Sequence, residues 1–216
     1  MKSIFHLTCV AALLILFSGC QKVYYQTMEK LGYPKRDLLV REVEKARDSQ
    51  KEAKDQFESA LERFSAVAGY EGGDLEDLYR SLSSEYEESK TRAEAVQQRI
   101  EAVSDVAGAL FEEWEKEIDQ YGDNRLRQVS RQKLSETRSR YKGLIEAMKR
   151  AEKKIPPVLT AFNDQVLYLK HNLNARAVAS LKNEVEGVRS EVGALIREMT
   201  ASIQQAERFI LQMEKE

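Results

Sequence analysis

Cysteine, histidine and proline are scarce in this chain of 216 residues, which contains two cysteines, two histidines and three prolines. Cys9 lies within an apolar run near the N-terminus, so Cys20 is the only cysteine downstream and no disulfide can form within the rest of the chain. His171 is the only histidine in the same part, which is too few for a zinc-type site or for a di-iron bundle that needs Glu-x-x-His twice.

Catalytic motifs are missing as well. His171 has no serine in a GxSxG-like motif near it, and Gly72-Gly73 stands alone rather than in a phosphate-binding loop. The carboxylates of residues 112–117 are typical of a solvated helix face, and we expect Trp114 to belong to the core. The formal charge of −2 does not favour nucleic acid as a partner. We therefore expect no enzymatic activity, no metal, no cofactor and no small-molecule substrate.

The apolar run Ile4–Phe17 is about 14 residues long, whereas a membrane-spanning helix needs roughly 20. Lys2 precedes it and the small residues Ser18-Gly19 follow, which is the pattern of a secretory signal peptide. Cys20 comes directly after that pair, and LFSGC resembles the lipobox of bacterial lipoproteins. In that class the cysteine thiol receives a diacylglycerol, the chain is cut just before the cysteine, and the new amine is acylated. We expect residues 1–19 to be removed and Cys20 to be lipidated; the alternative is an ordinary signal peptide with an incidental cysteine.

Residues 20–33 are expected to form a lipidated N-terminus and tether. Gln21 stands where an Asp retains enteric-type lipoproteins in the inner membrane, so the resemblance implies an outer-membrane location facing the periplasm. Two or three acyl chains anchor stably, while one does not. The tether carries four apolar residues at helical spacing, which either lie in the lipid headgroup layer or pack on the main body: Tyr24, Tyr25, Met28 and Leu31.

From residue 34 onward, apolar residues recur in alternating steps of 3 and 4, the heptad pattern of a coiled coil. The first predicted helix begins at Pro34 and ends before the glycine-rich residues 69–73. The second begins after Asp74, a plausible N-cap, and ends near Tyr121. A third follows residues 122–124 and continues to Ile155.

Pro156-Pro157 is expected to end or kink the third helix, because proline lacks the backbone donor and clashes with the preceding turn. The fourth stretch starts at Leu159, and its step becomes 4 and 4 between Leu173 and Leu181. We interpret this as a stutter, which locally unwinds a continuous coiled coil. A second apolar column at Ile196, Ile203 and Ile210 indicates a bundle rather than a simple pair.

The fold expected for residues 34–216 is therefore a single all-α domain, an elongated antiparallel three- or four-helix bundle with coiled-coil heptads. Antiparallel neighbours follow from the short predicted connections.

Polar residues crowd around the predicted stutter: Lys170, His171, Asn172, Asn174 and Arg176. Asn competes with the helix backbone, which favours a bend, and a buried Asn can also set helix register. These readings make the group a structural feature. The alternative is a recognition patch for a protein partner, and the sequence leaves both open.

Five long motifs carry a resemblance to a family: YYQTMEKLGYPKRDLLV, KARDSQKEAKDQFESALERFSAV, GGDLEDLY, ALFEEWEKEIDQY and FNDQVLYLKHNLNARAVASL. Together they are similar to the domain of unknown function 2959, a family of bacterial lipoproteins, over nearly the whole chain after the signal peptide. The resemblance implies a Gram-negative, helical, coiled-coil-rich lipoprotein. It implies no activity and no catalytic residues.

Two functions are consistent with these features. The first is a lipid-anchored periplasmic scaffold, spacer or adaptor that acts through contacts with an unknown envelope protein or with itself. The second is a membrane-shaping or envelope-stress module that contacts lipid through amphipathic helices. For the second, the sequence offers one dense basic cluster, which Glu146 and Glu152 dilute: Lys149, Arg150, Lys153 and Lys154.

Overall fold

The computed structural model describes residues 34–67, 74–172 and 175–215, and within them it does not describe the side chains of residues 175–180. The described residues form helices and no strand, so the all-α prediction is confirmed. The helices are α3 (Lys35–Ala66), α4 (Leu75–Ile118), α5 (Asn124–Lys153), α6 (Ile155–His171) and α7 (Ala175–Glu214). The predicted signal peptide, Cys20, the tether and the turn at 69–73 lie outside the described residues.

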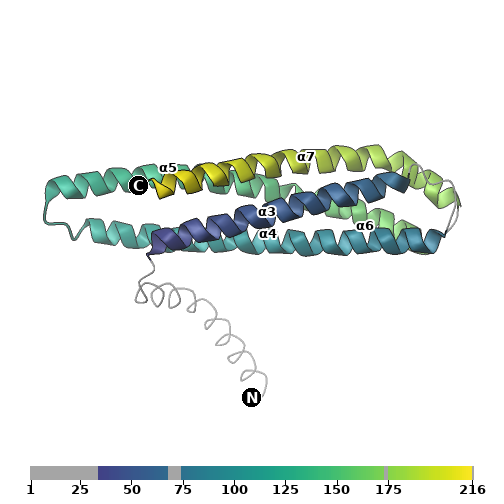
Figure 1. Cartoon of the computed structure of the whole chain (residues 1–216), viewed down its shortest axis with the longest axis horizontal. Coiled ribbons are helices and arrows are strands. Elements are labelled where there is room, and N and C mark those ends of the chain that lie inside the picture. Colours follow the sequence, from purple (N-terminus) through teal and green to yellow (C-terminus); the bar gives the residue numbers. More distant parts are fainter. Residues whose placement is uncertain (1–33, 68–73, 173–174, 216) are drawn as a thin grey trace, which may run out of the picture.

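The helices make an elongated bundle of four rods, in which α5 and α6 follow each other along one rod (Figure 1). The hairpin partner of α3 is α4, and α3 also packs on α7. The α5–α6 rod packs on α4 and α7 from the other side. Neighbouring rods run in opposite directions, which confirms the elongated antiparallel bundle in its four-rod form. The 44 residues of α4 make a helix about 66 Å long.

The α3–α4 hairpin forms because one apolar stripe on each helix is buried against the other. Leu39, Val43, Ala53 and Phe57 of α3 have no exposed surface, and Val96 and Val103 of α4 are equally buried. Burying a side chain of this size contributes about 1.5–3 kcal/mol. The stripe predicted from the steps of 3 and 4 is therefore the buried face of this hairpin.

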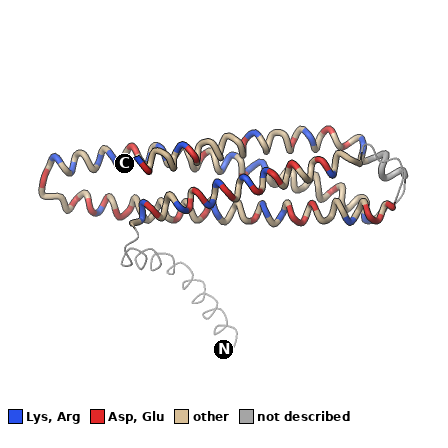
Figure 2. The backbone as a smooth tube through the Cα atoms, viewed as in Figure 1, with Lys and Arg blue, Asp and Glu red and all other residues tan. Residues whose placement is uncertain are grey.

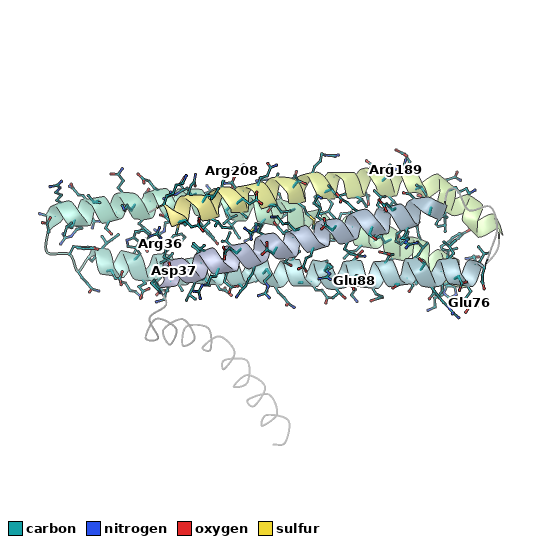
Figure 3. All side chains as sticks on the ribbon, in the orientation of Figure 1. Arg36, Asp37, Glu76, Glu88, Arg189 and Arg208 are labelled. Carbon is teal, nitrogen blue, oxygen red and sulfur yellow. The ribbon has the colours of Figure 1, made fainter. Side chains whose placement is uncertain are left out.

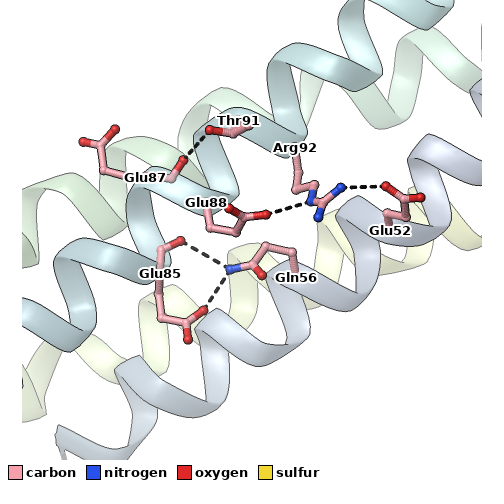
Figure 4. Close-up of polar contacts among 7 residues, drawn as sticks. All are labelled: Glu52, Gln56, Glu85, Glu87, Glu88, Thr91 and Arg92. Atoms are coloured by element: carbon pink, nitrogen blue, oxygen red, sulfur yellow. Dashed lines mark hydrogen bonds and ion pairs between the residues drawn. The ribbon is translucent and has the colours of Figure 1, made fainter.

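Polar contacts flank the buried stripe of the hairpin (Figure 4). The Gln56 side-chain amide donates to the Glu85 carboxylate at 2.8 Å and to the Glu85 carbonyl oxygen at 3.4 Å. Arg92 of α4 donates to Glu88 on its own helix at 2.9 Å and to Glu52 on α3 at 2.6 Å. These contacts tie α3 to α4 at one register. Exposed pairs of this kind each contribute about 0.2–1 kcal/mol.

Side-chain caps begin two of the helices. The Asp74 carboxylate accepts a hydrogen bond from the Glu76 backbone N–H at 2.8 Å, which confirms Asp74 as the N-cap of α4. The Asp123 carboxylate accepts from the backbone N–H groups of Arg125 and Leu126 at the start of α5. Such caps satisfy amides that have no partner within the helix.

The two prolines interrupt the third rod without turning the chain back. The helix α5 ends at Lys153, and α6 begins at Ile155 with Pro156 in its first turn, where a missing donor costs little. Lys154 between them keeps a nearly helical backbone, with φ −86° and ψ −12°. The predicted interruption at the prolines is confirmed, and α6 continues along the same rod (Figure 1).

The interpretation of the 4-and-4 step as a stutter is wrong. The helix α6 ends at His171, and α7 begins at Ala175 and runs back against α6. Asn172 leaves the helical region with φ −137° and ψ 60°, as expected of a residue whose side chain competes for backbone hydrogen bonds. The heptad spacing of apolar residues resumes in α7 because α6 and α7 each bury an apolar stripe in the same core.

Aromatic rings join two rods across the core. Phe162 of α6 stacks on Phe64 of α3, with ring centroids 4.3 Å apart and an interplanar angle of 2°. Phe57 of α3 is the other ring near it, at 6.3 Å. Further along the core, the Ser202 hydroxyl donates to the Gln50 side-chain oxygen at 2.9 Å between α7 and α3.

Within the described residues, no helix combines the length and the apolar character that a membrane crossing requires.

Candidate functional site

The two ends of the bundle differ. Lys35, at the start of α3, contacts Glu113 of α4 at 2.6 Å, and the Arg36 guanidinium donates to the Met213 carbonyl near the end of α7. The first residues of α3 and the last turn of α7 therefore lie side by side, and Arg36 and Asp37 mark this end in Figure 3. Glu76 marks the opposite end, where α3 gives way to α4 and α6 to α7. We call these the proximal and distal ends.

Three of the five predicted patch residues can be placed, and they lie at the distal end. Lys170 and His171 are exposed in the last turn of α6, where positive charge is favourable for the helix dipole. The Asn172 side-chain amide donates to the Tyr168 carbonyl oxygen at 3.0 Å. Asn174 and the Arg176 side chain lie outside the described residues. Asn172 thus helps to end α6, which agrees with the structural reading; recognition stays a prediction.

A cavity of about 500 Å³ lies between α6 and α7, close to the distal end. Carboxylates from both helices line it: Asp164 from α6, and Glu184 and Glu191 from α7. All three are exposed, and within the described residues none of them forms an ion pair. Tyr168 also lines the cavity, with 38% of its surface exposed. The result is an acidic pocket, a name kept below for this cavity.

Gln165 of α6 lines the acidic pocket and is only 3% exposed. Neither its side-chain nitrogen nor its side-chain oxygen has a hydrogen-bond partner within the described residues. Each buried polar group without a partner costs about 1–3 kcal/mol, so the molecule holds this amide at a cost to its stability. A buried amide without a partner beside an acidic cavity makes this place the candidate functional site.

Sequence reasoning missed Gln165 because the α6 stripe can be drawn in two ways. The more apolar choice runs through Leu159 and Val166, and it leaves Gln165 outside. In the structure Val158 is 1% exposed while Leu159 is half-buried, so the buried face includes Val158 and Gln165 as well as Val166. The signal available was the step from Phe162 to Gln165 to Leu169, which is a heptad step with a polar residue in it.

The α4–α5 turn overhangs the proximal end (Figure 1). Arg150 of α5 pairs with Glu198 of α7 at 3.6 Å, so the first turns of α5 lie beyond the last residue of α7. The Trp114 indole N–H donates a hydrogen bond of 2.9 Å to the Ser130 hydroxyl, which joins α4 to α5 within the overhang. The Trp114 side chain is half-buried. Three large apolar residues of this overhang are exposed: Tyr121 at 39%, Leu126 at 54% and Val129 at 48%.

Charges of both signs alternate along the whole bundle, as Figure 2 shows. The predicted basic cluster is exposed on α5 and its end, and Arg150 within it pairs with Glu198. Within the described residues, no group of three or more His, Cys, Asp or Glu side chains is placed to hold a metal ion.

Glu152 lies beside this cluster, and partial burial raises the pKa of its carboxyl, with repulsion from Glu101 adding to the effect. The folded chain therefore keeps the Glu152 proton to higher pH than the unfolded chain does. The contribution of Glu152 to the free energy of unfolding falls as the pH rises above the unfolded pKa near 4.5. We expect Glu152→Gln to stabilise the protein more at pH 7 than at pH 4, as measured by urea unfolding.

Glu146→Gln is the control for this prediction, because Glu146 is exposed on the same helix. Its replacement is expected to change the free energy of unfolding by no more than about 0.5 kcal/mol, because it is an exposed position. Equal effects of Glu152→Gln at pH 4 and pH 7 would contradict the assigned role of Glu152.

Residues 24–213 match the family described as protein of unknown function (DUF2959), and the chain belongs to that family. No curated protein and no solved structure matches the chain.

Proposed function

We propose that this chain is a lipid-anchored, non-enzymatic scaffold, spacer or adaptor of the Gram-negative envelope. Lipidated Cys20 would hold it at the outer membrane, facing the periplasm, and its partner would be another envelope protein or a second copy of the chain. The observation that carries the proposal is the asymmetry of the bundle. The chain enters α3 at the proximal end, so the distal end is displaced from the entry point by the length of α3, about 48 Å for 32 residues.

The character of the surface supports the same proposal. Charged residues of both signs cover the rods, while the acidic pocket and the end of α6 with Lys170, His171 and Asn172 lie near the distal end. A rod of this kind presents a partner site at a set distance from its proximal end. Between Cys20 and Pro34 lie 13 residues, enough to span at most about 47 Å when fully extended.

A chain that carries Cys20→Ser, with residues 1–19 replaced by a signal peptide that is cut without lipidation, tests the anchor. We expect it to move from the membrane fraction to the soluble periplasmic fraction, because the acyl chains supply the membrane affinity. Its helical circular dichroism and its melting temperature should match those of the wild type, since the bundle begins after the tether. Retention of the folded variant in the membrane fraction would contradict the anchor.

Such retention would favour a second candidate function, direct lipid contact by the overhang. Tyr121, Leu126 and Val129 are exposed at the end where the chain enters α3, as a membrane-contacting tip requires. A Cys20→Ser chain that also carries Leu126→Glu and Val129→Glu separates the two functions. Release only after these added substitutions would assign the membrane affinity to the overhang.

A further inference from the structure

We propose that the acidic pocket between α6 and α7 binds a basic peptide segment of the partner protein. An Arg or Lys side chain would lie among the carboxylates, and a peptide carbonyl would accept from the Gln165 amide. This inference rests on the proposed function, because it names the chemistry of the partner that a scaffold would hold.

Charge selects the side chain of the ligand. Asp164 on one helix and Glu184 and Glu191 on the facing helix line the same cavity, and within the described residues none of the three forms an ion pair. Elsewhere on α7, Glu186 pairs with Arg189 at 3.0 Å and Glu207 pairs with Lys51 at 2.9 Å. Within the described residues, cations thus pair with neighbouring acids of α7, and none pairs with the acids of the pocket. Guanidinium groups match carboxylates in shape and in number of donors.

Gln165 selects a peptide over a simple cation. Its side-chain oxygen needs a donor and its side-chain nitrogen needs an acceptor, and neither has a partner in the part of the chain that the structure describes. A guanidinium or ammonium group supplies the donor, and the carbonyl of a peptide backbone supplies the acceptor. A polyamine has donors only, so it would leave the nitrogen without a partner. Both polar atoms of Gln165 are buried in the free protein, so binding would have to turn this side chain toward the cavity that it lines.

The walls of the acidic pocket leave room for such a segment. A side-chain carbon placed on Gly187 would meet no atom within 4 Å, so the absence of a side chain there widens the space between the helices. A volume of about 500 Å³ is within the range of ligand sites and accommodates one long side chain with part of its backbone.

Two matched peptides test the proposal on the full chain purified in a nonionic detergent. The first is a labelled acetyl-Gly-Ser-Arg-Ser-Gly-amide, and the second carries citrulline in place of arginine, which keeps the shape and removes the charge. Fluorescence anisotropy is expected to show binding of the arginine peptide at least about tenfold tighter than that of the citrulline peptide. Raising the salt concentration should lower the affinity for the arginine peptide, because salt screens the charge of exposed carboxylates.

Variants assign the binding to the acidic pocket. Gln165→Met is expected to lower the affinity for the arginine peptide about tenfold, because two hydrogen bonds are lost. Glu184→Gln with Glu191→Gln should weaken it about three- to tenfold. Glu186→Gln is the control: it makes the same change on the same helix, outside the pocket, and should leave the affinity unchanged.

Equal binding of the arginine and citrulline peptides would overturn the proposal. So would a Gln165→Met chain that binds the arginine peptide as tightly as the wild type. Spermidine provides a third test. If it displaces the arginine peptide equally well from the wild type and from the Gln165→Met chain, the pocket attracts cations in general, and the proposal is overturned. These titrations do not depend on acylation, so their failure is distinguishable from membrane retention of Cys20→Ser.

Discussion

Phe162→Ala is expected to lower the free energy of unfolding by about 3–5 kcal/mol. The Phe162 ring has no exposed surface and stacks on Phe64 at 4.3 Å, with Phe57 at 6.3 Å. It is the side chain through which α6 reaches α3 across the core, so its removal opens a cavity between two rods. The 17 residues of α6 follow α5 along one rod and end at the reversal near Asn172, so the helix is held at both ends and collapses poorly into this cavity.

Urea unfolding followed by circular dichroism measures this loss, and Leu167→Ala supplies the control. Leu167 belongs to the same helix but is 45% exposed, so its truncation should change stability by no more than about 0.5 kcal/mol. A loss below about 1 kcal/mol for Phe162→Ala would mean that α6 does not pack on α3, since surface positions behave in that way. The four-rod arrangement would then be wrong.

Gln165→Met is expected to raise the free energy of unfolding by about 1–3 kcal/mol, the cost of leaving a buried amide without partners. Methionine has nearly the same length and volume, and its flexible thioether adapts to an irregular gap. Gln165 is 3% exposed, so the gain comes from the core rather than from the surface. The same variant is expected to lose affinity for the arginine peptide.

Gln56→Met makes the same substitution where the amide is satisfied. Gln56 donates to the Glu85 carboxylate at 2.8 Å, so its replacement is expected to lower stability by about 0.5–1.5 kcal/mol. Opposite signs for the two variants would show that the partners of the amide, and not its chemical type, decide the effect. A loss of stability for Gln165→Met would mean that its amide is hydrogen-bonded in the free protein, and would remove the main reason to expect a ligand there.

A gain in stability together with a loss of binding would identify Gln165 as a residue kept for function. Natural chains sit just above the stability that they need, and buried polar groups without partners are tolerated where binding requires them. The acidic pocket therefore links stability to recognition through one residue.

Much of the fold follows from local patterns. Apolar residues in steps of 3 and 4 mark the buried face of each helix, as with Leu39 and Val43 in α3. Asp74 begins α4 as an N-cap, and Pro156-Pro157 separates α5 from α6. These features were readable because each depends on the backbone and side chains of a few neighbouring residues.

Two features of this protein depend on its tertiary structure. The reversal at Asn172 looks like a stutter in the sequence, because heptad spacing reports which face is buried and not the direction of the chain. The burial of Gln165 was hidden for a related reason: Gln165 and Val166 lie about 100° apart on the helix and both are buried, so the apolar stripe through Val166 gave no sign that its neighbour also faces the core. The sequence by itself determined the helices and their caps. Only packing of α6 against α3, α4 and α7 decided which stripe faces the core, and thus where the acidic pocket forms.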